Sequence, residues 1–421
     1  MRDARSAASR GLLYLLLEFA ARPGAAPLNL HMMPEKGTSG AGAVCLDGSD
    51  AGFYYAPAAD KDSRTWHLFF QGGGWCYDEV DCWGRSHTLL GSSKNWPETM
   101  DGGGISSDDC SINPDLCNAH HVIFRYCDGN SFTGDRAEPL TVSVGGADKK
   151  LYFRGKRILD AVLDTLLENM GLASAEIVLL TGCSAGGLAT FLHADYVHNV
   201  LKERAGGLQK YRVAPISGFF LKHATVEGKP VYEDEIKYIF QLANSSGGVN
   251  ARCIAAHAAD EQWKCNFAEV TYAYIESPIF VLNSALDSWQ MGCIYTADYP
   301  QGYPKQTGLQ NGNCSAVPNW KACARSPELC SAAQVEKLNQ YISDFNDTLH
   351  GTATSGKVGN GAFLVSCHTH CEAQTDAFWR TFAVDGVTMQ QAFSLWWQST
   401  NEPAGGHTYL PCHYRSESPH R

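Results

Sequence analysis

The sequence predicts an α/β fold with a mostly parallel central sheet and helices on both of its faces. Two observations predict it. Short apolar stretches alternate with longer amphipathic stretches between residues 65 and 366, as in a chain built of strand–helix units. Glycine-rich or reactive polar segments follow several of the apolar stretches directly, which is typical of the ligand-binding edge of a parallel sheet. The chain has 421 residues and 44% hydrophobic content, enough for a substantial core.

Five short apolar stretches are predicted to be strands. They span residues 65–70, 121–126, 176–180, 277–283 and 362–366. Their lengths fall in the range of about four to eight residues that is usual for buried strands. We expect the segments just after them to share one edge of the sheet. These segments are 71–75, 127–130, 181–186, 284–287 and 367–371.

Two amphipathic stretches are predicted to be helices that cover the sheet. The first spans residues 151–171, with apolar side chains at three-to-four spacing and Gly171 as a stop signal. The second spans residues 331–349. Its apolar side chains on one face are Val335, Leu338, Tyr341, Ile342 and Phe345.

The first 30 residues are predicted to be a secretory signal peptide with a loose segment after it. Three arginines precede an apolar stretch at residues 11–20, and small residues follow at 24–26. A first helix of the fold is the alternative. Residues 23–42 are rich in Pro, Gly and Ala, so we expect one domain from residue 42 to residue 415, ordered from about Ala43.

The charge and hydropathy patterns exclude two classes of partner. The net charge is −11, from 33 basic and 44 acidic residues, and no long basic run is present. Nucleic acid is therefore not an expected partner, because phosphate backbones require clustered Lys and Arg. Beyond the N-terminal stretch, no segment approaches the roughly 18 uninterrupted apolar residues of a membrane span.

The sixteen cysteines indicate an oxidising compartment. Several lie close together in the sequence, as Cys76/Cys82, Cys110/Cys117, Cys323/Cys330 and Cys367/Cys371. Zinc binding is the alternative, but Cys-x-x-Cys pairs are absent, so disulfides of undetermined connectivity are favoured. The tripeptides that start at Asn244, Asn313 and Asn346 have the form of glycosylation acceptors.

Ser184 is the candidate nucleophile. It lies at the centre of Gly182-Cys-Ser-Ala-Gly186, directly after the predicted strand 176–180 and before a helical stretch. A Gly-x-Ser-x-Gly turn between strand and helix requires small neighbours and places the serine at the end of the sheet. The alternative is a glycine-rich turn without chemistry, since the pentapeptide also occurs by chance.

An acid and a histidine follow in the order that such a serine needs. Asp287 comes four residues after the strand 277–283, and it could also cap a short helix. His368 and His370 both follow the last predicted strand, and spacing alone leaves the choice between them open. With Cys367 and Cys371 they could in principle bind zinc, but adjacent side chains diverge too much for one tetrahedral site.

Three backbone N–H groups are candidates for an oxyanion hole. One belongs to Ala185, directly after the serine. The others belong to Gly74 and Trp75, in the glycine-rich segment after the strand 65–70. A phosphate-binding loop is the alternative for this segment, but it lacks the Gly-Lys-Ser helix start.

These motifs together resemble the pectin acetylesterase family, which also contains the Notum carboxylesterases. The resemblance extends from about Gly42 to Cys412 and is closest to plant-type members. One departure is Gln71, where the family usually has Glu. The matching segments are GAVCLDGS, GGGWC, LGSSK, RYCDGNSFTGD, FRG, GCSAGGL, PIFVLNSALDSWQ and SCHTHC.

The resemblance implies an α/β-hydrolase-like fold and a triad of Ser184, Asp287 and His370. His370 is preferred because the family pattern places its histidine three residues after the Ser-Cys pair. Gly74, Trp75 and Ala185 match the oxyanion-hole positions. Plant-type members keep a cysteine beside the serine, so Cys183 is expected to be a free thiol.

The implied activity is that of a secreted serine esterase of the cell wall, acting on acetylated polysaccharide such as pectin, with no cofactor or metal. Two alternatives remain: a Notum-like esterase that removes a fatty acyl group from a protein, and a secreted binding protein without catalysis. The net negative charge of the protein does not attract polygalacturonate. The charge around the cleft must therefore determine which polysaccharide binds.

Overall fold

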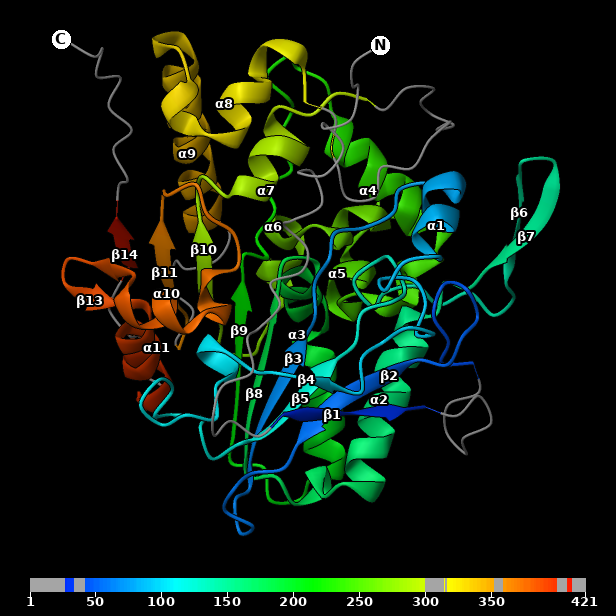
Figure 1. Cartoon of the computed structure of the whole chain (residues 1–421), viewed down its shortest axis with the longest axis vertical. Helices are drawn as coiled ribbons and strands as arrows, with labels where there is room; N and C mark the ends of the chain where they lie inside the picture. Colours follow the sequence, from blue (N-terminus) through cyan, green and yellow to red (C-terminus); the bar gives the residue numbers. More distant parts are fainter. Residues whose placement is uncertain are drawn as a thin grey trace, which may run out of the picture.

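A computed structural model describes residues 27–33, 42–299, 314, 316–351 and 359–399, and the backbone of 407–410. Its centre is a ten-stranded sheet in the order β14-β11-β10-β9-β8-β3-β5-β2-β1-β4 (Figure 1). Neighbours from β14 to β5 pair in parallel, whereas β2, β1 and β4 continue the sheet antiparallel. The strands are β1 (Leu28–Met32), β2 (Gly52–Ala56), β3 (Thr65–Phe70), β4 (Thr99–Met100), β5 (His120–Phe124), β8 (Ile177–Cys183), β9 (Lys210–Ile216), β10 (Phe280–Ser284), β11 (Gly361–Val365) and β14 (His407–Leu410).

Helices cover both faces of this sheet, as the sequence predicts. The larger core packs α2, α3 and α9 against one face, and a smaller core packs α10 and α11 against the other. Two small hairpins lie outside the sheet, β6 (Leu140–Val144) with β7 (Ala147–Leu151), and β12 (Ala383–Val384) with β13 (Val387–Thr388). The helices are α1 (Glu79–Arg85), α2 (Gly155–Asn169), α3 (Ala185–Arg204), α4 (Val231–Leu242), α5 (Ala251–Ala256), α6 (Ala268–Thr271), α7 (Ser288–Gln290), α8 (Lys321–Arg325), α9 (Ala332–Leu349), α10 (Asp376–Thr381) and α11 (Met389–Gln398).

The five predicted strands and both predicted helices are present, with ends shifted by a few residues. β3 matches its predicted bounds, and α9 begins after Ser331, which forms a capping box with Gln334. Helix α2 is shorter than predicted because Leu151 belongs to β7. Gly171 follows its end with a φ of 92°, a left-handed conformation that suits glycine.

The sheet begins earlier than predicted. β1 pairs with β2 through Asn29–Met32, inside the stretch that its Pro, Gly and Ala content marks as loose. β9 was also not predicted, because Arg212 and Pro215 interrupt its apolar pattern. Arg212 is nevertheless buried, since its guanidinium donates to the backbone carbonyls of Trp396 and Ser399. Of the first 30 residues, predicted to be a signal peptide and a loose segment, residues 1–26 lie outside the described residues, and residues 28–30 belong to β1.

Disulfides join distant parts of the described chain. Three of the close cysteine pairs, Cys76–Cys82, Cys110–Cys117 and Cys323–Cys330, are bonded as their proximity suggests. Cys371 does not pair with Cys367, which forms its own disulfide. Between described residues, the other bonds are Cys45–Cys127, Cys183–Cys371, Cys253–Cys265 and Cys293–Cys314.

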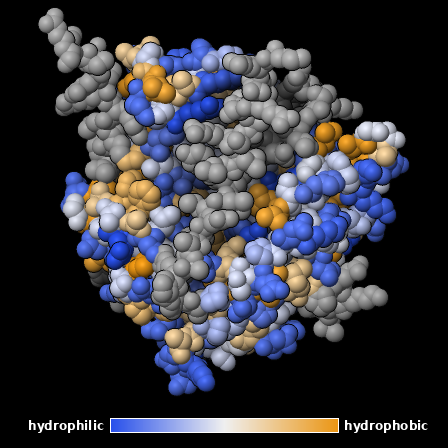
Figure 2. Space-filling view, in the orientation of Figure 1, coloured by the Kyte–Doolittle hydropathy of each residue, from blue (hydrophilic) through white to orange (hydrophobic). Residues whose placement is uncertain are grey.

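Figure 2 shows one face, on which apolar side chains form small groups among hydrophilic ones. Among the described residues, none of the helices combines the length and the hydrophobicity that crossing a bilayer requires.

Candidate active site

Ser184 occupies a sharp turn between β8 and α3. Its backbone has φ 61° and ψ −127°, a strained conformation for a residue with a side chain. The N–H of Ser184 donates to the carbonyl of Ile216 on β9 at 3.0 Å, which fixes the turn to the neighbouring strand. The side chain is mostly enclosed, because Ser184 is only 7% exposed. The predicted strand–serine–helix arrangement is therefore present.

Close backbone contacts explain the glycines around this serine. A Cβ atom on Gly186 would lie 2.0 Å from the carbonyl oxygen of Phe70, and one on Gly182 would lie 2.3 Å from that of Gly186. A Cβ on Gly72 would lie 2.1 Å from the carbonyl oxygen of Cys183. Any larger residue would push β3, β8 and α3 apart, so these glycines fix the serine at the end of the sheet.

Asp287 and His370 are hydrogen-bonded at the same edge of the sheet. His370 Nδ1 donates to Asp287 Oδ2 at 2.7 Å. The other carboxylate oxygen of Asp287 accepts the N–H groups of Trp289 and Gln290, so Asp287 also caps α7. Asp287 therefore caps α7 and hydrogen-bonds His370 at the same time. The bond through Nδ1 leaves Nε2 of His370 available to a substrate or nucleophile.

The electrostatic surroundings favour the charged form of His370. Burial alone would lower its pKa, but the charge of Asp287, their hydrogen bond and the charge of Glu372 together raise the pKa above its usual value. Glu372 also accepts the backbone N–H of His370 at 2.9 Å. Burial raises the pKa of Glu372 itself. A histidine in these surroundings is a stronger base than one in water.

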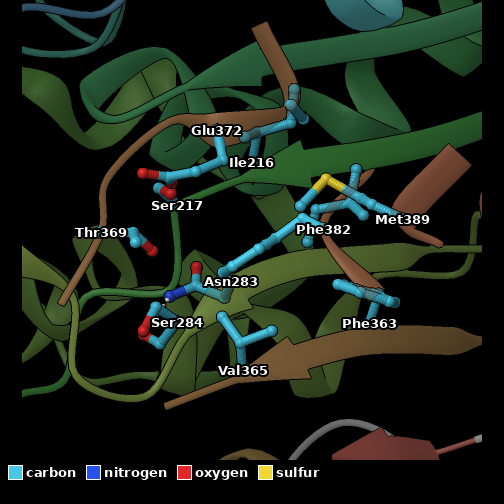
Figure 3. A pocket seen from close by; sticks show the side chains of 12 residues that line it. Ile216, Ser217, Asn283, Ser284, Phe363, Val365, Thr369, Glu372, Phe382 and Met389 are labelled. Atoms are coloured by element: carbon cyan, nitrogen blue, oxygen red, sulfur yellow. Dashed lines mark hydrogen bonds between the residues drawn. The ribbon is translucent and has the colours of Figure 1, made fainter. Parts of the chain in front are cut away.

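Several hydrogen bonds hold the loop that carries His370, the histidine loop (residues 366–373). Cys371 N–H donates to Ser217 Oγ at 3.0 Å, and Thr369 O accepts the N–H of Ser288 at 3.0 Å. A small pocket lies beside the loop, with Ser217, Thr369 and Glu372 among its lining (Figure 3). The opposite side of this pocket is apolar, so the polar groups face the loop rather than the core.

A disulfide connects the nucleophile turn to the histidine loop. Cys183, directly before Ser184, is bonded to Cys371, directly after His370, with 5.9 Å between their Cα atoms. The expectation that Cys183 is a free thiol is wrong, because sequence proximity cannot show a partner 188 residues away. Among the described residues, Ser184 Oγ forms no hydrogen bond. The disulfide links the nucleophile turn to the histidine loop covalently.

His368 and the zinc alternative do not fit the structure. His368 Nε2 donates to the carbonyl of Ala324 at 3.1 Å and so points toward α8. Cys367 and Cys371 are in disulfides and cannot supply thiolates. One other group in the described chain, Cys253 with His257 and Cys265, has the proximity of metal ligands, but its two sulfurs are bonded to each other.

The segment after β3 presents free N–H groups near the serine turn. Gly73 and Gly74 have φ angles of 143° and 63°, which favour glycine. Within the described residues, the N–H groups of Gly74 and Trp75 donate to no protein acceptor. The N–H of Ala185 has no partner within α3, because it opens the helix. Unpaired N–H groups are rare inside proteins, so these groups are available to donate to a ligand.

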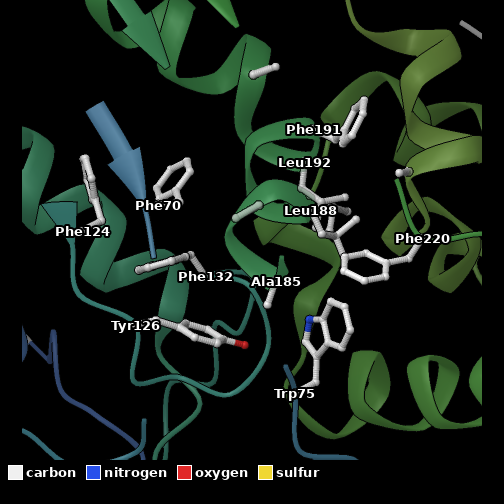
Figure 4. Close-up of a cluster of buried hydrophobic side chains, with 14 of the residues drawn as sticks. Phe70, Trp75, Phe124, Tyr126, Phe132, Ala185, Leu188, Phe191, Leu192 and Phe220 are labelled. Carbon is white, nitrogen blue, oxygen red and sulfur yellow. The ribbon is translucent and has the colours of Figure 1, made fainter. Parts of the chain in front are cut away.

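Aromatic side chains enclose the space around these groups. Trp75 contacts Phe220 and Trp289, with ring centroids 4.9 and 5.2 Å apart. Phe220 also lies 6.4 Å from the His370 ring. Figure 4 shows Trp75 and Phe220 beside Ala185 at the start of α3. Phe220 was not predicted from the sequence, because it follows β9, one of the strands that the sequence pattern does not indicate.

Comparisons with known proteins identify the family of this chain. The Pectinacetylesterase family model matches residues 25–418. Pectin acetylesterase 11 of Arabidopsis thaliana is 31% identical over 80% of this chain and 79% of its own, and pectin acetylesterase 4 is 32% identical over 79% and 74%. The palmitoleoyl-protein carboxylesterase Notum of Mus musculus is 29% identical over 89% of this chain and 66% of its own.

A solved structure shares the fold. The Wnt deacylase Notum from Drosophila superposes with a TM-score of 0.71 over 92% of this chain and 98% of its own, at 24% identity. Its identity is too low to transfer a substrate, but the shared architecture is that of an α/β hydrolase. The family model covers nearly the whole sequence, and the chain therefore belongs to the Pectinacetylesterase family of carboxylesterases.

Proposed function

We propose that this protein is a serine esterase that removes acetyl groups from a cell-wall polysaccharide such as pectin, with Ser184 as nucleophile, His370 as base and Asp287 as the acid that orients it. The observation that carries the proposal is the 2.7 Å bond between His370 Nδ1 and Asp287 Oδ2, on a loop linked by a disulfide to the residue before Ser184. Names of the Arabidopsis relatives supply the substrate class.

The reaction follows from this arrangement. His370 Nε2 takes the proton of Ser184 as its oxygen bonds to the ester carbonyl carbon. The N–H groups of Gly74, Trp75 and Ala185 stabilise the resulting oxyanion. The carbon–oxygen bond to the sugar breaks, and His370 returns the proton to the departing hydroxyl. Water, deprotonated by the same histidine, then releases acetate from Ser184.

The aromatic packing favours a short acyl group over a long one. Trp75, Phe220 and Tyr232 are at most 2% exposed and contact one another, so they fill the space beside the predicted oxyanion hole. Trp289 closes the group through contacts with Trp75 and Phe220. An acetyl group needs little room here, whereas a palmitoleoyl chain would have to displace several rings.

The proposal is tested by acyl release from acetylated pectin, acetylated xylan and p-nitrophenyl esters of two to sixteen carbons. We expect acetate release from pectin and hydrolysis that declines steeply with chain length. Ser184→Ala should lose at least about 10³-fold in rate while its fold persists. Ser343→Ala, on helix α9, is the matched control and should behave as wild type.

Three results would contradict the proposal. Undiminished hydrolysis by Ser184→Ala would exclude that serine as nucleophile. Preference for the longest esters would favour the Notum-like alternative. Absence of hydrolysis of every ester by folded wild-type protein would favour a binding protein without catalysis.

We also propose that the protein acts outside the cell. The disulfides support an oxidising compartment. Asn244 is exposed, as glycosylation requires, and Asn346 is half-buried. Expression in a secreting eukaryotic host should give protein in the medium whose mass falls on treatment with an N-glycosidase. Retention of all the protein inside the cells would contradict the proposed location.

A further inference from the structure

One buried arginine holds the carbonyl groups of the segment that supplies two predicted oxyanion donors. Arg85 is the last residue of α1 and is 6% exposed. Its Nη2 donates to the carbonyls of Gly73 at 2.9 Å and Gly74 at 3.4 Å, and its Nη1 donates to that of Trp75 at 3.4 Å. Its Nε donates to the carbonyl of Leu90 at 3.2 Å. All the hydrogen-bonding sides of the guanidinium are therefore directed at backbone oxygens.

The direction of these carbonyls determines the direction of the N–H groups. In a planar trans peptide, the carbonyl of one residue points opposite to the N–H of the next. The Gly73 carbonyl shares a peptide with the Gly74 N–H, and the Gly74 carbonyl shares one with the Trp75 N–H. Because Arg85 holds both carbonyls, both N–H groups point away from it, and these are the two that donate to no described residue.

Tyr126 holds the same glycine-rich segment as Arg85. Its hydroxyl donates to the Gly74 carbonyl at 2.8 Å, and the Arg85 guanidinium lies 5.1 Å from the centre of its ring. Figure 4 shows the Tyr126 hydroxyl directed toward the side on which Trp75 lies. The Cys76–Cys82 disulfide joins the glycine-rich segment to α1, which keeps Arg85 close to the carbonyls.

The hydrogen bonds of Arg85 go to neutral backbone carbonyls rather than to a carboxylate. The buried carboxylate of Asp128 interacts with this charge, which opposes the rise in the pKa of Asp128 that burial causes. A buried positive charge behind two peptides polarises them, so that their N–H groups carry more positive charge toward the site.

We propose that Arg85 is a positioning residue of the oxyanion hole: it orients and polarises the peptides of Gly74 and Trp75 through their carbonyls. This rests on the proposed ester hydrolysis, since it assigns those two N–H groups to the transition state. Arg85 does not touch the substrate, so it should affect the rate of the chemical step far more than substrate binding.

The test compares Arg85→Met and Arg85→Lys with Arg212→Met. Arg212 is the matched control, because it is equally buried and also donates to backbone carbonyls. It lies near the start of β9, at the end of the strand away from the candidate active site. With p-nitrophenyl acetate, Arg85→Met should lose about 10²-fold in kcat, with KM within about threefold of wild type. Arg85→Lys should recover part of the loss. Arg212→Met should lose thermal stability but keep kcat within about threefold.

A transition-state mimic separates positioning from general damage. The affinity for 1,1,1-trifluoroacetone, which adds to a serine and leaves an oxyanion, should fall in parallel with kcat in Arg85→Met and remain unchanged in Arg212→Met. Tyr126→Phe removes one hydrogen bond to the Gly74 carbonyl and should lose about tenfold in kcat, which keeps the test decisive if Arg85→Met fails to fold.

A folded Arg85→Met with kcat within threefold of wild type would overturn the proposal, as would an equal loss in Arg212→Met. A crystal structure of Arg85→Met or Arg85→Lys provides a readout that does not depend on turnover. It should show the Gly73–Gly74 or Gly74–Trp75 peptide rotated. Peptides in an unchanged orientation, together with unchanged affinity for the inhibitor, would also overturn the proposal. If wild type hydrolyses no ester, the proposed function fails, and the peptide orientation still decides whether Arg85 positions this segment.

Discussion

At the scale of single residues, Glu372 should adjust the pH range of activity. Its charge raises the pKa of His370, and a protonated His370 cannot act as base, so activity falls as pH decreases through that raised pKa. Glu372→Gln keeps an acceptor for the His370 N–H but removes the charge. We expect the acidic limb of kcat/KM to move to lower pH, with activity at pH 5 relative to pH 8 roughly doubled or more.

The control for this change is Glu328→Gln. Glu328 is exposed, and its charge acts on His368 rather than on His370. Its pH profile should match wild type. An unchanged profile in Glu372→Gln, or a shift to higher pH, would contradict the assigned effect of the charge.

Also at the scale of single residues, Phe220 should limit the length of the acyl group that the enzyme accepts. Phe220→Ala removes a buried ring between Trp75 and His370, so an eight-carbon ester gains room. The ratio of octanoyl to acetyl hydrolysis should rise about tenfold. Phe393→Ala, equally buried in the smaller core on the other face, should lose stability without changing this ratio. An unchanged ratio in both variants would show that the acyl group binds elsewhere.

At the scale of elements, the Cys183–Cys371 disulfide connects the turn after β8 to the loop after β11. Replacing both cysteines by Ala releases the histidine loop from the serine turn. We expect kcat to fall about 10- to 100-fold, because small misplacements of a base are costly, with KM changed much less. Replacing Cys110 and Cys117, which lie in a loop on the other face, should leave kcat near wild type. Equal kcat in both double variants would show that the disulfide only stabilises the fold.

The elements also show what the sequence could and could not predict. β3 and α9 were predicted well because a short apolar run and apolar side chains along one helix face are local signals. The sequence does not indicate β1, because it lies in a stretch rich in Pro, Gly and Ala. It does not indicate β9, because Arg212 and Pro215 interrupt the apolar pattern. Pairing with neighbouring strands stabilises both. Ser184 and Asp287 could be chosen because each follows a strand, whereas the choice of His370 over His368 depended on the family resemblance. Arg85, Ser217 and Phe220 could not, because their roles depend on contacts between segments far apart in the sequence.

At the scale of the whole molecule, buried histidines should make the fold sensitive to acid. His67 and His121 are buried and bonded to each other across β3 and β5, and burial lowers the pKa of His121 to about 4. Burial also lowers the pKa of His193, to about 3. The unfolded chain binds these protons near pH 6.5, so stability is complete above that pH and decreases as pH falls toward 4.

This loss can be measured by urea unfolding at pH 7.5 and pH 5. Each such histidine should contribute up to about 1.4 kcal/mol of unfolding free energy per pH unit in that window. His121→Asn should show a smaller difference between the two pH values than wild type, whereas His87→Asn, at an exposed position, should not. A wild-type protein equally stable at both pH values would contradict this prediction.

The central claim for the whole molecule is that distant segments meet to make Ser184 a nucleophile that carries the acyl group. The most direct measurement is rapid acid quenching of the enzyme during turnover of p-nitrophenyl acetate, followed by peptide mass spectrometry. We predict an acetyl group on Ser184 in wild type and none on that peptide in His370→Ala. An acetyl group on a different residue, or none on Ser184 while the wild-type enzyme turns over with a burst, would contradict the claim.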